Sequence, residues 1–400
     1  MPPLPRLANF LPTLLVPVLV VISARAEEPN IAARLQPFVD SHTLAGAVTL
    51  VASADRTLSL DAVGYADVAA RTPMKTDCLF WIASMSKPMT AAALMMLVDE
   101  GKVKLDDPVE KYLPEFRGQM VVAEQAPDRV VLKKPAHPIT VREVLSHTSG
   151  IPFMSRVQHK IDSFPLDHSA ITYALTPLKF EPGSKYDYSN AGINTAGRII
   201  EVVSGMPYED FVEKRLFQPL GMKDTTFWPS DEQMTRLAKS YRPDAAKTGL
   251  QEINIDQLSY PLTNRKRGPC PAGGYFATAS DVALFGRLIL GGGVFEGKRL
   301  LSESSVRELT STQTGALLNG GKGEGGYGLG FSTSRKSPGE SGPAVPGRCG
   351  HGGAYATDLA IDPQRHIVTV FMVQHAGYPG PDGGKVHPTF LKAAEAAFSK

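Results

Sequence analysis

The chain has 400 residues, 42% of them hydrophobic and 20% charged, so it is long and apolar enough to bury a sizeable core. Its formal net charge at pH 7 is +2, and no block of basic residues occurs in it. This composition predicts a globular protein and argues against nucleic acid as a partner.

The first 26 residues differ in composition from the rest. Arg6 precedes an apolar stretch at 14–22, and the small residues Ala24 and Ala26 stand just before an acidic segment. This layout predicts a signal peptide over residues 1–26 and an exported protein, periplasmic or secreted. An uncleaved anchor is the alternative, but the apolar stretch is shorter than the roughly 20 residues of a membrane helix, so we expect no stable membrane insertion.

Strand patterns occur near both ends of the chain, and the middle is mostly helical. The strand-like segments are 45–53, 57–66, 327–334, 354–362 and 366–374. Helices are predicted at 31–41, from Ser84 onward and at 388–398. We therefore expect one sheet assembled from the two ends of the chain, with an inserted helical region.

Three local patterns refine this outline. Thr140 with Glu143, and Thr278 with Asp281, have the spacing of helix-capping boxes. Residues 117–138 hold two apolar runs around a turn and predict a projecting hairpin. The run GGVFEGKR (292–299) resembles a phosphate loop but ends in arginine, so we predict a turn between short strands.

Three cysteines, Cys78, Cys270 and Cys349, are too few for a disulfide framework and too scattered for a zinc site. One disulfide between Cys270 and Cys349 plus one free thiol would suit an oxidising compartment. Three buried free thiols are the alternative. The sequence also has no H-E-x-x-H motif or comparable His/Asp cluster, so no metal is expected.

A nearly all-apolar helix, in the run FWIASMSKPMTAAALMMLVDEG, begins with a serine and a lysine three residues apart. At this spacing the Lys87 amine can reach the Ser84 hydroxyl. Helix N-terminal N–H groups favour a developing anion, and a poorly hydrated lysine is neutral often enough to accept the serine proton. Ser84 and Lys87 are therefore a candidate nucleophile and its proton acceptor. The alternative is an ordinary helix cap beside a solvated lysine.

Two other segments add candidate catalytic groups. Tyr188-Ser189-Asn190 offers a phenol and an amide in a loop just before a helix. His351-Gly352-Gly353 lies where we expect a strand to begin, with glycines that let a substrate backbone approach closely. Together with Ser84 and Lys87, these are the groups that acyl transfer through a serine requires. No G-x-S-x-G motif is present, which argues against an α/β-hydrolase.

The ordered set S-x-x-K, Y-x-N and a strand motif ending in glycine resembles the serine β-lactamase and penicillin-binding protein superfamily, on its class C side. That group also contains D-alanyl-D-alanine carboxypeptidases, D-amino-acid peptidases and esterases. Flanking phrases agree with it in order: LDDPVEKYLP (105–114), VLSHTSGIP (144–152), LFQPLGMKDTTF (216–227), AGGYFATASDVALFG (272–286) and GYGLGF (326–331). The resemblance implies an α+β fold in which helices flank an antiparallel sheet. Within one catalytic unit, 27–400, we expect a sheet region at about 27–105 and 295–400 and a helical region at about 106–294.

The resemblance also implies roles for these residues. Ser84 is the nucleophile, Lys87 shares its proton, and Tyr188 acts as the base, either as a phenolate or through Lys87. Asn190 orients the substrate amide or carbonyl. The backbone N–H groups of Ser84 and Ala354 form the oxyanion hole, at about 3 kcal/mol per donor. No cofactor is implied.

His351-Gly352-Gly353 departs from the family's best-known third motif, Lys-Thr-Gly. A lysine holds a substrate carboxylate with a fixed charge, whereas histidine is only partly protonated near neutral pH, and the middle glycine removes a hydroxyl donor. The departure argues against efficient penicillin hydrolysis.

Three further residues carry alternative interpretations. In relatives the phrase around His147 closes a helix below the site, so we expect a structural role for it. Tyr186 either lines the cleft or packs, and Tyr275 either faces the substrate or lies in the core.

We therefore expect an exported serine hydrolase that cleaves an ester or amide bond through a Ser84 acyl-enzyme. Its substrates would be small acyl or D-amino-acid-peptide-like molecules. The alternatives are a β-lactamase or D,D-carboxypeptidase acting on cell-wall peptides, and a non-catalytic homologue that binds peptidoglycan.

Overall fold

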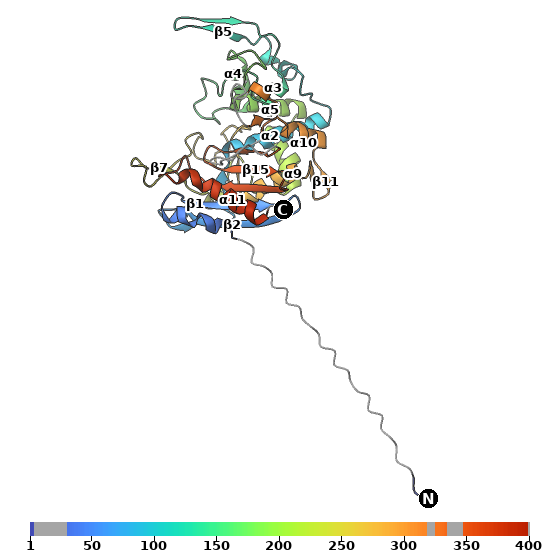
Figure 1. Cartoon of the computed structure of the whole chain (residues 1–400). Coiled ribbons are helices and arrows are strands. Elements are labelled where there is room, and N and C mark those ends of the chain that lie inside the picture. The colour runs from blue at the N-terminus through green and yellow to red at the C-terminus, as the bar shows by residue number, and fades with distance from the viewer. Residues whose placement is uncertain (4–29, 318–324, 334–346, 399–400) are drawn as a thin grey trace.

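The structure is a computed structural model that describes residues 1–3, 30–317, 325–333 and 347–398 (Figure 1). The predicted signal peptide, apart from its first three residues, lies outside these ranges. Within the described ranges, no helix is both long and apolar enough to cross a membrane.

An antiparallel sheet of eight strands joins the two ends of the chain, as predicted. From one edge to the other its strands are β12 (Gly326–Tyr327), β13 (Ser332–Thr333), β14 (Cys349–Gly352), β15 (Asp358–Asp362), β16 (Ile367–Met372), β1 (Gly46–Ala52), β2 (Thr57–Asp67) and β3 (Thr72–Pro73). The seam lies between β1 and β16, where Leu50 pairs with Val370. This arrangement confirms the predicted fold class.

Side chains on the central strands alternate between two apolar layers, because successive residues of a strand point to opposite faces. Val48 and Leu50 of β1 join the large core under α9 (Ala279–Leu290). Val51 of β1 and Phe371 of β16 instead join a second cluster with Phe390 of α11 (Val386–Phe398). Helices therefore cover both faces of the sheet.

The segment between the two sheet portions is mainly helical, with short hairpins. Besides α9 and α11, the helices of the described residues are, in chain order, η1 (Ala32–Leu35), α1 (Gln36–Asp40), η2 (Ala83–Met85), α2 (Ser86–Asp99), η3 (Val109–Lys111), η4 (Pro114–Phe116), α3 (Val141–Leu145), α4 (Leu166–Ala174), α5 (Asn190–Ser204), α6 (Tyr208–Val212), η5 (Glu213–Phe217), α7 (Gln218–Leu220), α8 (Asp231–Thr235), α10 (Glu303–Thr310) and η7 (Gly383–Lys385). The paired short strands are β4 (Phe80–Trp81) with β9 (Phe276–Ala277), β5 (Val121–Gln125) with β6 (Val130–Lys133), β7 (Ser240–Pro243) with β8 (Leu250–Ile253), and β10 (Val294–Phe295) with β11 (Lys298–Arg299). The boundary that we place between a sheet region and a helical region stays a prediction.

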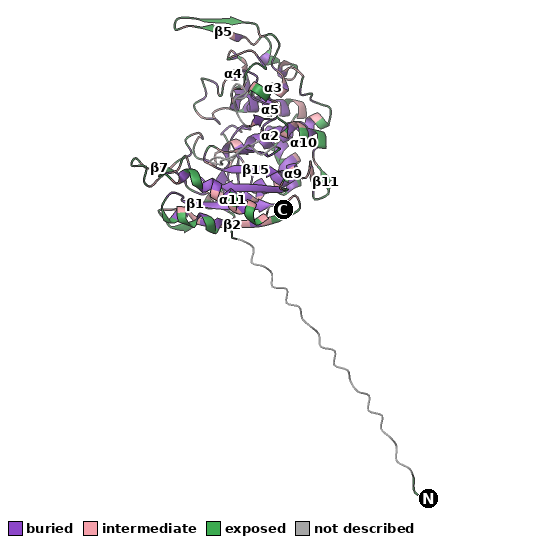
Figure 2. Cartoon of the chain, in the orientation of Figure 1, coloured by how far each residue is buried: buried purple, intermediate pink, exposed green. Residues whose placement is uncertain are grey.

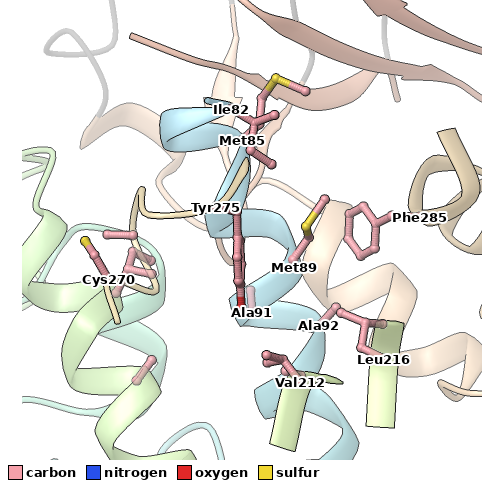
Figure 3. Close-up of a cluster of buried hydrophobic side chains, with 14 of the residues drawn as sticks. Ile82, Met85, Met89, Ala91, Ala92, Val212, Leu216, Cys270, Tyr275 and Phe285 are labelled. Atoms are coloured by element: carbon pink, nitrogen blue, oxygen red, sulfur yellow. The ribbon is translucent and has the colours of Figure 1, made fainter. Parts of the chain in front are cut away.

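Helix α2 lies at the centre of the large core and is buried from Ser86 to Leu97. Figure 3 shows apolar side chains gathered around it, among them Met89 of the helix itself, Tyr275 and Phe285. A helix buried on all sides is apolar all round, which explains why its sequence lacks the polar stripe of a surface helix. The serine–lysine pair thus lies at the start of the most buried helix of the fold.

Several local predictions are confirmed. The hairpin predicted within 117–138 is β5–β6, which projects from the body and is largely exposed (Figures 1 and 2). The run at 292–299 forms the hairpin β10–β11. Thr140 and Glu143 make both contacts of a capping box.

Other predictions need correction. The side chain of Thr278 does cap α9, but the Asp281 carboxylate instead accepts hydrogen bonds from Asp224 N–H and the Thr225 hydroxyl. The three cysteines are buried thiols that form no disulfide with one another, so the Cys270–Cys349 disulfide is wrong and the alternative of three thiols is confirmed.

Two predicted strands are also shorter than expected because tight turns interrupt them. The predicted strand 327–334 is interrupted by a turn, in which Gly328 N–H donates to the Phe331 carbonyl. Tyr327 therefore ends β12, and Ser332 begins β13. The segment 354–362 begins with a turn in which Gly353 N–H donates to the Thr357 carbonyl. His351 and Gly352 therefore end strand β14 instead of beginning a strand.

Gly286 sets how closely α9 approaches the sheet. A Cβ atom there would lie 2.5 Å from Cγ1 of Val368 and 3.2 Å from Cδ1 of Leu359. Gly286→Ala should therefore lower the free energy of unfolding by about 1–3 kcal/mol through overpacking, despite the higher helix propensity of alanine.

Urea unfolding measures this change. Gly384→Ala is the matched control, because a Cβ atom there meets no atom within 4 Å. Equal stability of both variants would show that α9 is not held at the limit of approach.

Candidate active site

Ser84 lies in the turn η2, between the short strand β4 and helix α2, and its side chain is partly exposed. Ala83, just before it, has a φ of 45°, in the left-handed region that a non-glycine residue seldom adopts. The turn is held from both sides: the Ser86 hydroxyl donates to the Ala83 carbonyl at 2.6 Å and accepts from Tyr275 N–H at 3.3 Å. The strained turn thus points Ser84 away from the buried helix that follows.

Lys87 is fully buried, and its Nζ lies 3.0 Å from Ser84 Oγ and 2.6 Å from the Ala272 carbonyl oxygen. A neutral amine satisfies both contacts, since it donates to the carbonyl and accepts the serine proton with its lone pair. Burial lowers the pKa of Lys87 to about 7. The lysine is therefore neutral in a large fraction of molecules near neutral pH.

Tyr188 lies beside this pair. The Lys87 Nζ atom is 4.7 Å from the centre of the Tyr188 ring. Burial raises the pKa of Tyr188 above its usual value, and a hydrogen bond with Ser84 offsets this only in part. The phenol is thus held in its protonated form, which argues against the phenolate as the form in which Tyr188 would act.

Asn190 is the first residue of α5 and is buried, with Ser189 as the helix cap. The Ser189 hydroxyl accepts from Gly192 N–H and donates to the Pro152 carbonyl. The Asn190 Oδ1 atom has no hydrogen-bond partner among the described residues. A buried acceptor left open costs free energy, so this atom is suited to accept from a substrate amide.

His351 ends strand β14, close to Tyr188 and Tyr327. Its Nδ1 lies 2.7 Å from the Gly352 carbonyl oxygen, which can only accept, so Nδ1 carries a proton. Its Nε2 lies 3.1 Å from the Tyr327 hydroxyl and 3.5 Å from the Tyr188 hydroxyl. Both ring nitrogens are therefore engaged by the protein.

Gly353 brings the turn after β14 against the turn that carries Ser84. A Cβ atom on Gly353 would lie 2.0 Å from Thr357 Oγ1 and 2.6 Å from the Ile82 carbonyl oxygen. Only glycine allows this approach, which sets the Ala354 backbone beside the segment that carries Ser84. Ala354 itself is exposed in the turn.

Sequence reasoning did not identify Tyr327 as part of this group, and it gave His147 a structural role. The His147 ring lies 4.5 Å from the rings of both Tyr188 and Tyr327, between centroids. Its Nδ1 accepts from Ser189 N–H at 3.1 Å, and burial lowers its pKa well below the usual value. His147 therefore holds the Tyr-Ser-Asn turn as a neutral imidazole. His147 lies far from Tyr188 and Tyr327 in the sequence, so no sequence pattern predicts that the three rings are in contact.

The sequence left two roles open for each of two further tyrosines, Tyr275 and Tyr186. Tyr275 is fully buried, and its hydroxyl donates to Tyr208 at 2.9 Å, so it belongs to the core. Tyr186 is partly buried, with its ring 5.9 Å from that of His147. In the described ranges no group of three or more His, Cys, Asp or Glu residues could hold a metal ion.

Comparison with known proteins agrees with this geometry. A family model described as Beta-lactamase matches residues 31–390. Protein Rv1367c of Mycobacterium tuberculosis is 32% identical over 362 residues, which cover 86% of this chain and 89% of that protein. Esterase EstB of Burkholderia gladioli is 34% identical over 215 residues, covering 50% of this chain and 52% of EstB.

A solved structure has a similar fold. EstCE1, described as a hydrolase with promiscuous acyltransferase activity, superposes with a TM-score of 0.74 at 24% identity, over 91% of this chain and 98% of that chain. The family model covers most of the chain, from the first helix to the last. The chain therefore belongs to the beta-lactamase family and is a serine hydrolase related to its esterases and penicillin-binding proteins.

Proposed function

We propose that the protein is an exported hydrolase that cleaves an ester or amide bond through an acyl-enzyme on Ser84. Its substrates are small acyl or D-amino-acid-peptide-like molecules. The observation that carries the proposal is the buried Lys87 amine, which contacts the Ser84 hydroxyl and has a pKa near neutrality. The resemblance of half the chain to an esterase supports an ester as one substrate class. Export rests on the signal-peptide pattern of residues 1–26.

The proposed reaction has two steps. Ser84 Oγ attacks the substrate carbonyl while Lys87 accepts the serine proton, and the N–H groups of Ser84 and Ala354 stabilise the oxyanion. Tyr188, protonated because it is buried, passes a proton to the leaving alcohol or amine and regains it from Lys87. Water then attacks the acyl carbon while Lys87 accepts its proton, the bond from that carbon to Ser84 Oγ breaks, and Lys87 returns the proton to Ser84 Oγ.

His351 bears on the choice of substrate. Its two ring nitrogens already contact Gly352 and Tyr327, whereas a lysine at this place would offer a fixed positive charge to a substrate carboxylate. We therefore rank a β-lactamase or D,D-carboxypeptidase second. A non-catalytic, peptidoglycan-binding role ranks third, because binding alone does not require a buried amine that destabilises the fold.

A covalent adduct on Ser84 is the first expected outcome. After brief exposure to an activated short-chain ester, and separately to benzylpenicillin, intact-mass spectrometry should show an acyl adduct on the wild type and none on Ser84→Ala. The melting temperature of the variant should be nearly unchanged, because Ser84 is partly exposed.

The lifetime of the adduct distinguishes the candidates, since a penicillin-binding peptidase keeps the penicillin adduct and an esterase turns the ester over. Full activity of Ser84→Ala would remove Ser84 as the nucleophile. The same spectra of exported protein report whether residues 1–26 have been removed.

The pH dependence of kcat/KM for a neutral ester should follow the Lys87 amine. Because the neutral amine is the base, activity should rise about tenfold per pH unit below the pKa and level off above it, with a midpoint at about pH 7. A rise that begins only near pH 10, where an ordinary lysine titrates, would contradict this role.

Lys87 should also lower stability. Its pKa of about 7 in the folded chain lies below the ordinary 10.5, so the unfolded chain binds a proton between these values and the folded chain does not. Stability is therefore lost as pH falls from about 10.5 to 7. Lys87→Met should abolish turnover but raise the melting temperature at pH 7 by a few degrees, with a smaller gain at pH 9.5.

Thermal unfolding at the two pH values tests this prediction. The exposed Lys298, replaced by methionine, is the control and should change the melting temperature little. A lower melting temperature for Lys87→Met at pH 7 would show that the buried amine stabilises the fold.

A further inference from the structure

The backbone of Ala272 links Lys87 to a second buried side chain, through the two peptide units that meet at its Cα atom. Its carbonyl oxygen accepts from Lys87 Nζ at 2.6 Å, and its N–H donates to Asn194 Oδ1 at 3.0 Å. We infer that Asn194 is a positioning residue, which fixes the Pro271–Ala272 peptide unit and so places the Ala272 carbonyl, on the following unit, where it aims the Lys87 amine at Ser84. The inference rests on the function proposed for Lys87.

The orientation of the Asn194 amide is set by its neighbours. Ala272 N–H can only donate, so Oδ1 must face it. The Nδ2 group donates to the Tyr173 hydroxyl at 3.1 Å, and the Cys270 thiol approaches Oδ1 at 3.6 Å. The amide is buried, with both of its ends in use, so it cannot turn without losing a contact.

Helix α5 brings Asn194 to this place. Asn194 lies four residues after Asn190 and three before Gly197, so the three residues share one face of the helix. A Cβ atom on Gly197 would lie 2.4 Å from Pro271, which shows how closely the helix approaches the loop. One helix face therefore presents Asn190 at the site and Asn194 at the loop behind Lys87.

The loop is anchored on both sides of Ala272 as well. The Thr90 hydroxyl donates to the Pro271 carbonyl at 2.7 Å, and Trp81 Nε1 donates to the Gly273 carbonyl at 2.8 Å. The Thr90 and Asn194 contacts hold the two ends of the Pro271–Ala272 peptide unit, and the Trp81 contact holds the unit that follows Gly273. Without Asn194, the Ala272 N–H would be buried and unpaired, so the Pro271–Ala272 unit would gain by rotating and would shift the Ala272 carbonyl that follows it.

Rotation of this peptide would affect turnover more than substrate binding. The neutral Lys87 amine needs the Ala272 acceptor to keep its lone pair directed at Ser84. A misdirected base slows proton transfer, whereas the substrate does not contact the lysine in the proposed mechanism. The expected signature is a lower kcat with little change in KM.

The test replaces Asn194 by leucine, which has a similar volume and no acceptor. Active sites are counted by titration to completion with a fluorophosphonate, so that kcat is expressed per folded, reactive serine. Asn194→Leu should lower kcat for a neutral ester by about tenfold or more, with KM within about twofold. Asn194→Asp keeps an acceptor for Ala272 N–H, and the Tyr173 hydroxyl can donate to it, so it should recover part of the lost kcat.

Tyr173→Phe is the matched control, because it removes the other partner of the Asn194 amide and leaves the Ala272 contact in place. It should keep most of the wild-type kcat. An unchanged kcat per titrated site in Asn194→Leu would overturn the inference, and so would an equal loss in Tyr173→Phe. If Asn194→Leu does not fold, Asn194→Ser, whose side chain is too short to reach the Ala272 nitrogen, replaces it in the comparison.

Two parallel variants separate this inference from the proposed function. If Ser84→Ala and Lys87→Ala lose turnover while Asn194→Leu keeps it, only the role of Asn194 fails. If Ser84→Ala keeps its turnover, the proposed function itself fails.

Discussion

The burial of one lysine amine organises this structure. Lys87 is fully buried, in surroundings that disfavour a charged ammonium. Its Nζ contacts Ser84 Oγ and the Ala272 carbonyl oxygen and lies over the ring of Tyr188. Burial lowers the pKa of the amine to about 7, which turns a surface-type cation into a base. Burying the Lys87 amine lowers the stability of the fold. Such a loss is usual for catalytic groups, the role that we propose for Lys87.

The residues around the Lys87 amine come from segments that lie far apart in the sequence. Ser84 precedes α2, Tyr188 and Asn190 stand at the start of α5, and His351 ends β14. Their meeting depends on close backbone approaches, such as that of Gly353 to the Ile82 carbonyl, two residues before Ser84. The aromatic and imidazole rings of His147, Tyr188 and Tyr327 then pack into one cluster that keeps the phenol of Tyr188 protonated.

Prediction from the sequence was reliable where a local rule applied and failed where a distant contact competed. The Thr140–Glu143 capping box formed as expected because both partners lie within one helical turn. The Asp281 carboxylate has the same local spacing, yet it turns to Asp224 and Thr225, which the fold brings beside it. The sequence left open whether Cys270 and Cys349 form a disulfide, because it gives no distance between two sulfurs, and the structure shows that they do not.

The sequence by itself determined the sheet built from both chain ends, the buried helix and the serine, lysine, tyrosine and asparagine at helix starts, because periodicity and spacing act over a few residues. Only the tertiary structure decided how far the pKa of Lys87 is lowered, that Tyr188 stays protonated and that His351 has both ring nitrogens engaged. It also placed Asn194 behind Ala272. A pKa depends on burial, and a hydrogen bond on the position of its partner, and both arise from residues far away along the chain.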